Sequence, residues 1–200
     1  MTGDPAPTFD SGIVRRLTIS TPEDMAELGA SLARQLAAGD LVTLNGELGA
    51  GKTTLTRGLG EALGVRGAVT SPTFVLARTH RRLDDAAPPL VHVDAYRLST
   101  AAELDDLDID FARSIVVVEW GAGLLDGITD TWLSLDIARP TGARVLSGST
   151  ESSDSAESAD ERADATEPSD ADDGVEPREV TITGHGDRWK DLGWVGASRN

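Results

Sequence analysis

The residues most able to do chemistry form one short run in the first third of the chain. Residues 46–53 read GELGAGKT and satisfy the phosphate-loop pattern G-x-x-x-x-G-K-[ST]. Glycines in such a run allow backbone N–H groups to turn inward around phosphate oxygens. Lys52 adds a full positive charge for the β and γ phosphates, and the hydroxyl of Thr53 is suited to ligate Mg²⁺. The run predicts a site for a nucleoside triphosphate and its magnesium ion.

The lysine content makes this assignment specific. The chain contains two lysines, Lys52 and Lys190, and one of them falls at the position that the motif requires. This coincidence disfavours the alternative of a glycine-rich turn that binds nothing. Thr54 offers a second hydroxyl near the phosphates.

Two acidic residues are candidates to complete the site. Asp94 follows the mainly apolar residues 90–93 (LVHV), and Glu119 follows the β-branched run 115–118. The carboxyl ends of strands are where α/β sheets bind ligands. A phosphate loop needs one carboxylate near the metal ion, and a hydrolase needs a second to orient water. The spacing leaves open which acid has which role, and either could instead cap a helix or face solvent.

The identity of the nucleotide follows from an absence in the sequence. GTPases commonly recognise guanine with an Asn/Thr-Lys-x-Asp loop. Neither lysine of this chain stands in that pattern. The sequence therefore favours ATP.

Strands and helices that alternate along the chain must position these residues. Strands are expected at residues 15–19, 41–44, 74–79, 88–93 and 115–118. A helix is expected to begin after Thr21, to continue through Leu36 and to stop near Gly39. Further helices are expected at 52–63 and 100–111. Gly58 and Gly60 lower the helix propensity of residues 52–63, so another factor must favour that helix.

The last two strand candidates, 132–137 and 178–183, alternate in polarity and could pair as a hairpin with a very long loop. Together the elements predict an α/β fold of the P-loop NTPase type. Its mainly parallel sheet would be flanked by helices, with antiparallel strands near the C-terminus.

The composition bounds the other possibilities. The 200 residues carry 18 basic and 34 acidic side chains, a formal net charge of −16. This acidic balance argues against a broad grip on nucleic acid or on an anionic membrane. The absence of cysteine excludes disulfides and a thiol nucleophile. We find neither a signal peptide nor an apolar run long enough to cross a membrane, so we expect a cytoplasmic protein.

The charge is concentrated near the C-terminus. Residues 151–177 contain eleven acidic residues and one basic residue, and they include almost no large apolar side chain. Such a segment cannot bury enough surface to offset its ordering entropy. We therefore expect a disordered N-terminus at 1–12, a P-loop ATPase domain at 13–140 and an acidic disordered insert at 141–177. Residues 178–200 would supply the closing strand and C-terminal segment of the same domain.

Four motifs in order point to a known family. They are GELGAGKTT at 46–54, SPTF at 71–74, HVDAYRL at 92–98 and VEW at 118–120. Together they resemble the small bacterial P-loop ATPases of the TsaE (YjeE) family. That family works in making threonylcarbamoyladenosine, the tRNA modification beside the anticodon. The acidic insert is not part of this resemblance.

The resemblance implies roles for individual residues. Thr53 and Asp94 would ligate Mg²⁺, with Glu119 beside them, and Glu119 would position or activate the attacking water. Thr73 would sense the γ-phosphate, and Trp120 would lie beside the nucleotide. Lys52 and Glu119 would thus be the catalytic residues. The nucleotide-binding residues of the loop would be Glu47, Leu48, Gly49, Ala50, Gly51, Lys52, Thr53 and Thr54.

Three other positions complete the comparison with the family. His92 is interpreted as a packed strand residue rather than as a catalytic base. Glu47 stands where the family often has Asp. Asp108 follows Leu107 where we would expect a small residue.

The resemblance also implies partners. The family's ATPase acts with a heterodimer of TsaD-type and TsaB-type ASKHA-fold proteins, which transfers the threonylcarbamoyl group, and hydrolysis resets that complex. Contact with tRNA would be indirect. Two alternatives remain open. One is a P-loop kinase of a small metabolite, with Arg78, Arg81 and Arg82 as a lid; the other is a nucleotide-binding module that does not hydrolyse.

Overall fold

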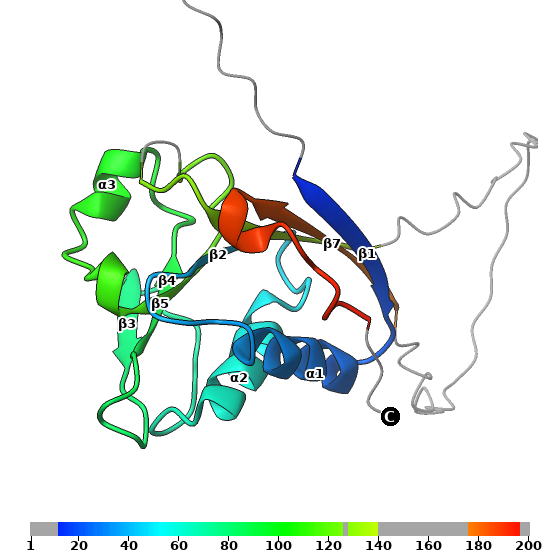
Figure 1. Ribbon diagram of the computed structural model, residues 1–200, viewed down its shortest axis with the longest axis horizontal. Coiled ribbons are helices and arrows are strands. Elements are labelled where there is room, and N and C mark those ends of the chain that lie inside the picture. Colours follow the sequence, from blue (N-terminus) through cyan, green and yellow to red (C-terminus); the bar gives the residue numbers. More distant parts are fainter. Residues whose placement is uncertain (1–11, 126–127, 140–175, 197–200) are drawn as a thin grey trace, which may run out of the picture.

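A seven-stranded sheet organises the chain, with strand order β1-β7-β6-β2-β5-β4-β3 (Figure 1). The computed structural model describes residues 12–125, 128–139 and 176–196. The strands are β1 (Ile13–Ile19), β2 (Leu41–Asn45), β3 (Ala77–His80), β4 (Leu90–Asp94), β5 (Ile115–Glu119), β6 (Trp132–Ala138) and β7 (Arg178–His185). Strands β6, β2, β5 and β4 run parallel, whereas β3, β7 and β1 are antiparallel to their neighbours. The predicted α/β fold is confirmed.

Both faces of this sheet are covered, one by two long helices and the other by shorter elements. Figure 1 shows α1 (Pro22–Ala33) and α2 (Lys52–Leu63) side by side below the strands. Their leucines, such as Leu32 and Leu59, are fully buried against strand residues of that face. The opposite face packs on α3 (Ala101–Asp105) and the segment after β5, through Leu104 and Leu124. Because both faces are covered, the central strands β2, β4 and β5 are buried along almost their whole length and are mainly apolar.

The sheet brings the candidate residues to one edge. β2 is central and leads directly into the phosphate loop, which α2 follows. On the neighbouring strands, Asp94 and Glu119 are the last residues of β4 and β5, and the parallel register pairs them with each other. Loop and acids therefore share the carboxyl edge of the sheet.

Helix α1 begins where the sequence predicts and ends early. Thr21 and Asp24 form a reciprocal capping box at its start. The expected extension through Leu36 to Gly39 is wrong, since the helix ends at Ala33. The reason lies in tertiary contacts of the following residues. Asp40 accepts a hydrogen bond from the Ala37 N–H at 2.8 Å and forms an ion pair with Arg188 of the C-terminal segment, so this stretch folds as a loop.

Two further boundaries differ from expectation. The strand expected at 74–79 begins only at Ala77, because the N–H groups of Val75 and Leu76 both bond the Pro72 carbonyl in a turn. The helix expected at 100–111 is only Ala101–Asp105, followed by the short 3-10 helix η1 (Phe111–Arg113). Asp108 adopts a left-handed φ of 54°, so helical geometry cannot continue through it to Phe111.

The expected long-range hairpin is confirmed, since β6 pairs antiparallel with β7 from Trp132–His185 to Ala138–Glu179. The segments predicted to be disordered, 1–12 and 141–177, lie outside the described residues apart from their ends. Among the helices that the structure describes, none has the length and apolarity needed to cross a membrane.

The two helices approach so closely that glycine is required between them. A Cβ added at Gly58 of α2 would lie 2.1 Å from the carbonyl oxygen of Ala26 in α1, and one at Gly29 would lie 2.1 Å from the Leu55 carbonyl. These contacts are with backbone, which cannot move aside. Helix α2 therefore forms despite its glycines because they allow it to pack on α1.

We expect Gly58→Ala to lower the free energy of unfolding by about 1–3 kcal/mol, although alanine is the better helix former. Urea denaturation of the purified protein measures this change. The matched control is Glu61→Ala, an exposed position on the same helix, expected within about 0.5 kcal/mol of wild type. A Gly58→Ala protein as stable as wild type would contradict the close packing of α1 on α2.

Candidate functional site

Backbone conformation shapes the phosphate loop. Gly46, Gly49 and Gly51 have φ values of 144°, 76° and 112°, which residues with side chains rarely adopt. A Cβ at Gly46 would also lie 2.3 Å from the Ile137 carbonyl oxygen of β6. The loop thus lies against the sheet at one end and opens into α2 at the other.

The start of α2 is suited to an anion. Its N-cap is Gly51, which provides no side-chain hydrogen bond to the first turn. The N–H groups of that turn and the positive end of the helix dipole therefore remain available to a phosphate. This geometry fits the predicted nucleotide.

The side chain of Lys52 extends back across the phosphate loop to its first residues. Its Nζ donates hydrogen bonds to the carbonyl oxygens of Gly46 at 2.7 Å and Glu47 at 3.0 Å, and the residue is only 5% exposed. Burial lowers the pKa of Lys52, while the nearby carboxylates of Glu119 and Asp94 act in the opposite direction. The lysine charge is thus held at the centre of the loop.

Aromatic rings line the side of the site facing Lys52. Its Nζ lies 3.7 Å from the ring centroid of Trp120, within the range of a cation–π contact. Tyr96 meets the Trp120 ring edge-on, with centroids 5.4 Å apart. Trp120 itself has a left-handed φ of 63°. Such a conformation costs about 1–3 kcal/mol and is typical of functional sites.

The two acids are buried and each accepts hydrogen bonds. Thr53 Oγ1 donates to Glu119 Oε1 at 3.0 Å, and Thr73 Oγ1 donates to Asp94 Oδ2 at 2.6 Å. Asp94 also accepts the Tyr96 N–H at 3.1 Å. Each predicted hydroxyl is thus paired with one predicted carboxylate. A hydroxyl that donates its proton to an acid keeps its lone pairs free for a metal ion.

These oxygens fit magnesium better than other metals. Within the described residues no cluster of three His, Asp or Glu could bind a metal by itself. Mg²⁺ does not need one, because it is commonly held by one or two carboxylates together with water and substrate phosphates. The hydroxyl of Thr53 and the carboxylates of Asp94 and Glu119 form a donor set of this type.

Two cavities lie on either side of the loop. The first, of about 300 Å³, is lined by Leu48, Gly49, Gly51, Lys52, Thr53, Thr54, Ser71, Thr73, Asp94, Glu119 and Trp120. The second, of about 440 Å³, shares Gly49, Gly51 and Thr54 with it and adds residues that include Met25, Arg139 and Arg178. The shared residues make the two cavities neighbours across the loop.

The structure brings together most of the predicted site residues. Glu47 and Ala50 alone among them do not line the first cavity. Glu47 contributes its backbone carbonyl to Lys52, and Ala50 is buried beside the second cavity.

Sequence reasoning missed several supporting residues. Arg139 directly follows β6 and Arg178 is the first residue of β7, and no local pattern marked them. Arg97 had no assigned role, yet its guanidinium donates to the Thr73 carbonyl at 2.8 Å and so supports the loop that carries Thr73. Its place in the 92–98 motif was the available signal.

Known proteins resemble this chain closely. The family model described as threonylcarbamoyl adenosine biosynthesis protein TsaE matches residues 19–145. The tRNA threonylcarbamoyladenosine biosynthesis protein TsaE of Streptomyces coelicolor is 52% identical over 168 residues, which cover 82% of this chain and 93% of that protein. The protein of the same name from Mycobacterium tuberculosis is 47% identical over 130 residues, or 61% of this chain and 77% of that protein.

A solved structure is similar in fold. The crystal structure of Bacillus subtilis YdiB superposes with a TM-score of 0.59 and 24% sequence identity, over 90% of each chain. At this identity the likeness extends to the fold alone.

We expect Lys52→Ala to weaken ATP binding at least tenfold, because it removes the charge at the centre of the loop. Calorimetric titration of ATP, with intrinsic tryptophan fluorescence as a second method, measures this loss. The control is Lys190→Ala, which removes the other lysine and its 2.8 Å ion pair with Asp187. Equal ATP affinity in wild type and Lys52→Ala would refute the phosphate-loop assignment.

Proposed function

The chain belongs to the TsaE family of threonylcarbamoyl adenosine biosynthesis proteins, and from this premise we propose that it is a Mg²⁺-dependent ATPase required for that tRNA modification. One observation carries the proposal. Asp94 and Glu119, paired across adjacent parallel strands, lie at the phosphate loop with Lys52 and Thr53. A phosphate-binding loop with two carboxylates has what triphosphate hydrolysis requires.

The residues divide into three functions in this proposal. Lys52 and the first turn of α2 bind the phosphates. Thr53 and Asp94, with Glu119 beside them, hold Mg²⁺, which when bound neutralises charge on the phosphate oxygens. Thr73 donates to Asp94 and lies in a turn with exposed side chains, so it is placed to respond to the γ-phosphate.

Glu119 is the residue that orients the attacking water. Both hydrogen bonds that its side chain makes with the described residues fall on Oε1, which leaves Oε2 for a water molecule. Its side chain lines the same cavity as Lys52 and Thr73. A buried carboxylate in this position can hold water in line with a bound phosphate.

The second cavity is suited to the nucleoside. It adjoins the phosphate loop at Gly49 and Gly51 and the first turn of α2 at Thr54. It is also lined by the apolar Met25 together with Arg139 and Arg178. A planar base packs well against such side chains.

The protein acts through partners in this proposal. Its net charge of −16 is unfavourable for direct binding of tRNA. The partners would be the TsaD-type and TsaB-type subunits that transfer the threonylcarbamoyl group, and ATP hydrolysis would reset their complex. Cytoplasmic action follows from the same role.

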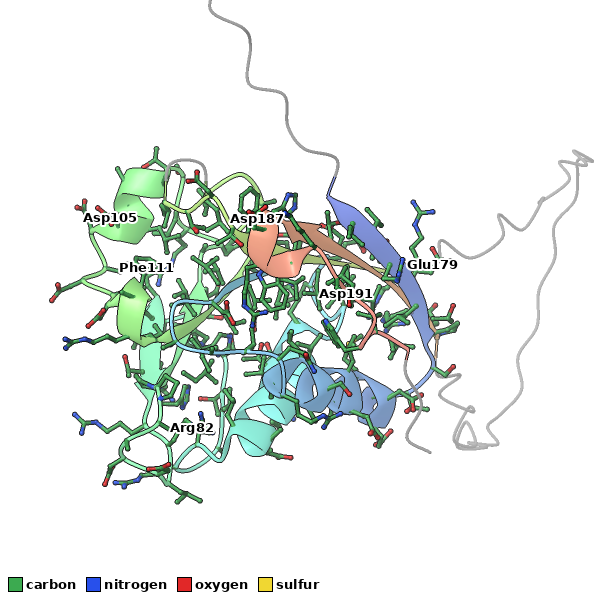
Figure 2. The ribbon with its side chains drawn as sticks, in the orientation of Figure 1. Arg82, Asp105, Phe111, Glu179, Asp187 and Asp191 are labelled. Carbon is green, nitrogen blue, oxygen red and sulfur yellow. The ribbon has the colours of Figure 1, made fainter. Side chains whose placement is uncertain are left out.

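The position of Arg82 disfavours its part in the arginine lid of the kinase alternative. Arg82, labelled in Figure 2, donates to the carbonyl of Leu63 at 2.6 Å. Leu63 is the last residue of α2, whereas Lys52 is the first. At 1.5 Å per residue these ends are roughly 16 Å apart. Arg82 therefore supports the far end of the helix and is not placed to cover the phosphates.

We expect Glu119→Gln to lower the rate of ATP hydrolysis at least a hundredfold while ATP affinity stays within about threefold of wild type. The neutral amide retains the shape of the side chain but cannot orient water as a base. Steady-state hydrolysis in the presence of the two partner subunits, with a parallel binding titration, separates the two effects. Unchanged turnover would assign the water to another residue.

Depletion of this protein is expected to lower the threonylcarbamoyladenosine content of bulk tRNA, as measured by nucleoside mass spectrometry. Wild type should restore it, and Lys52→Ala and Glu119→Gln should not. Restoration by Glu119→Gln would favour a nucleotide-binding module that does not hydrolyse. An unchanged content after depletion would oppose the proposed role and lead back to a kinase.

A further inference from the structure

A buried histidine lies behind the carboxylate of Glu119. His92 is on β4, two residues before Asp94, so both side chains project from the same face of the sheet. Its side chain is fully buried. The imidazole Nε2 lies 2.8 Å from Glu119 Oε1 on the adjacent strand. The sequence interpretation of His92 as only a packed strand residue does not account for this contact.

The surroundings of the ring determine which nitrogen carries the proton. Nδ1 of His92 is buried without a hydrogen-bond partner among the described residues. A proton on Nδ1 would leave an unpaired N–H in an apolar layer, which costs about 1–3 kcal/mol. A lone pair there is tolerated far better. The neutral ring therefore carries its proton on Nε2 and donates it to Glu119.

A purely structural role would be better filled by another residue. The neighbours of His92 on this face include Leu90 and Val117, both fully buried. An apolar side chain would pack among them without the cost of burying a polar group. Within the described part of the chain, the bond to the carboxylate is the one contact that compensates the imidazole, which ties its presence to Glu119.

The consequence concerns the orientation of Glu119. Oε1 accepts from His92 at 2.8 Å and from Thr53 at 3.0 Å, and neither contact uses Oε2. Two donors on one oxygen fix the rotation of the carboxylate. We propose that His92 is a positioning residue, which holds Glu119 with Oε2 directed to the phosphate cavity. This inference rests on the proposed function, in which Glu119 orients the attacking water.

The first test compares two substitutions. His92→Leu removes the donor at similar volume, and His92→Gln restores a donor N–H near the position of Nε2. We expect His92→Leu to lower kcat for ATP about 10–100-fold, the usual effect of losing a partner that orients a catalytic ligand, with KM within about threefold. His92→Gln should recover most of that loss.

Two controls separate positioning from packing. His80→Leu removes another buried imidazole, on β3, that does not bond Glu119, and it should leave kcat unchanged. In a Glu119→Gln background, His92→Leu should cause little further loss, because the carboxylate to be oriented is already gone. Equal losses of kcat in both backgrounds, or a loss in His92→Gln as large as in His92→Leu, would overturn the proposal.

A second measurement does not depend on hydrolysis. Nitrogen-15 NMR of the histidine side chains reports which ring nitrogen is protonated. We expect His92 as the Nε2–H tautomer, with a shift that changes in Glu119→Leu and not in Asp191→Ala, which alters an exposed residue of the C-terminal segment. An Nδ1–H tautomer, or insensitivity to Glu119→Leu, would overturn the positioning role. If wild type hydrolyses no ATP even with its partners, the proposed function fails, while the NMR result still decides whether His92 holds Glu119.

Discussion

Two carboxylates buried side by side are the constraint on which the rest of the site depends. Asp94 and Glu119 are 4% and 3% exposed and face each other in register. Charges this close, removed from water, are tolerated only when each is bonded and opposite charge lies nearby. The buried Lys52 supplies the charge, and the neighbouring hydroxyls, N–H groups and imidazole supply the bonds. The loops at this edge of the sheet must therefore place the lysine and these hydrogen-bond donors within reach of the two carboxylates.

The sheet fixes the positions of the two acids, and the loops carry the residues that would respond to a ligand. Both acids end strands whose apolar side chains are fully buried, so their backbone positions are fixed. The residues that would respond to ligand lie instead on turns, where Thr73 follows Pro72 and Trp120 holds a left-handed backbone. Arg97 ties the first turn to the segment after β4. A rigid base with a few strained or exposed loops suits a protein that exchanges nucleotide.

Local patterns were enough to predict the fold class and to find the residues around the phosphate loop. The motif at 46–53 fixes a strand, a turn and a helix at once, and strands as apolar as 115–118 have few alternatives. Errors arose where distant residues decide. Helix α1 ends early because Arg188 and Asp40 organise the following loop. The bond from His92 to Glu119 could not be predicted because it depends on the register of β4 against β5, and Arg139 and Arg178 enter the site only through the long-range pairing of β6 with β7.

The position of β1 in the sheet affects how the protein is made. Its hydrogen-bonding neighbour is β7, yet β1 ends at residue 19 and β7 begins at residue 178. A ribosome adding roughly 5–20 residues per second needs roughly 8–32 s to synthesise the chain between them. Once β6 has been synthesised, it is the exposed edge of the nascent sheet until β7 follows, and its exposed Asp136 discourages pairing with other chains. The phosphate loop can fold while the chain is still on the ribosome. The lining of the second cavity is complete only after β7, which carries Arg178, has emerged.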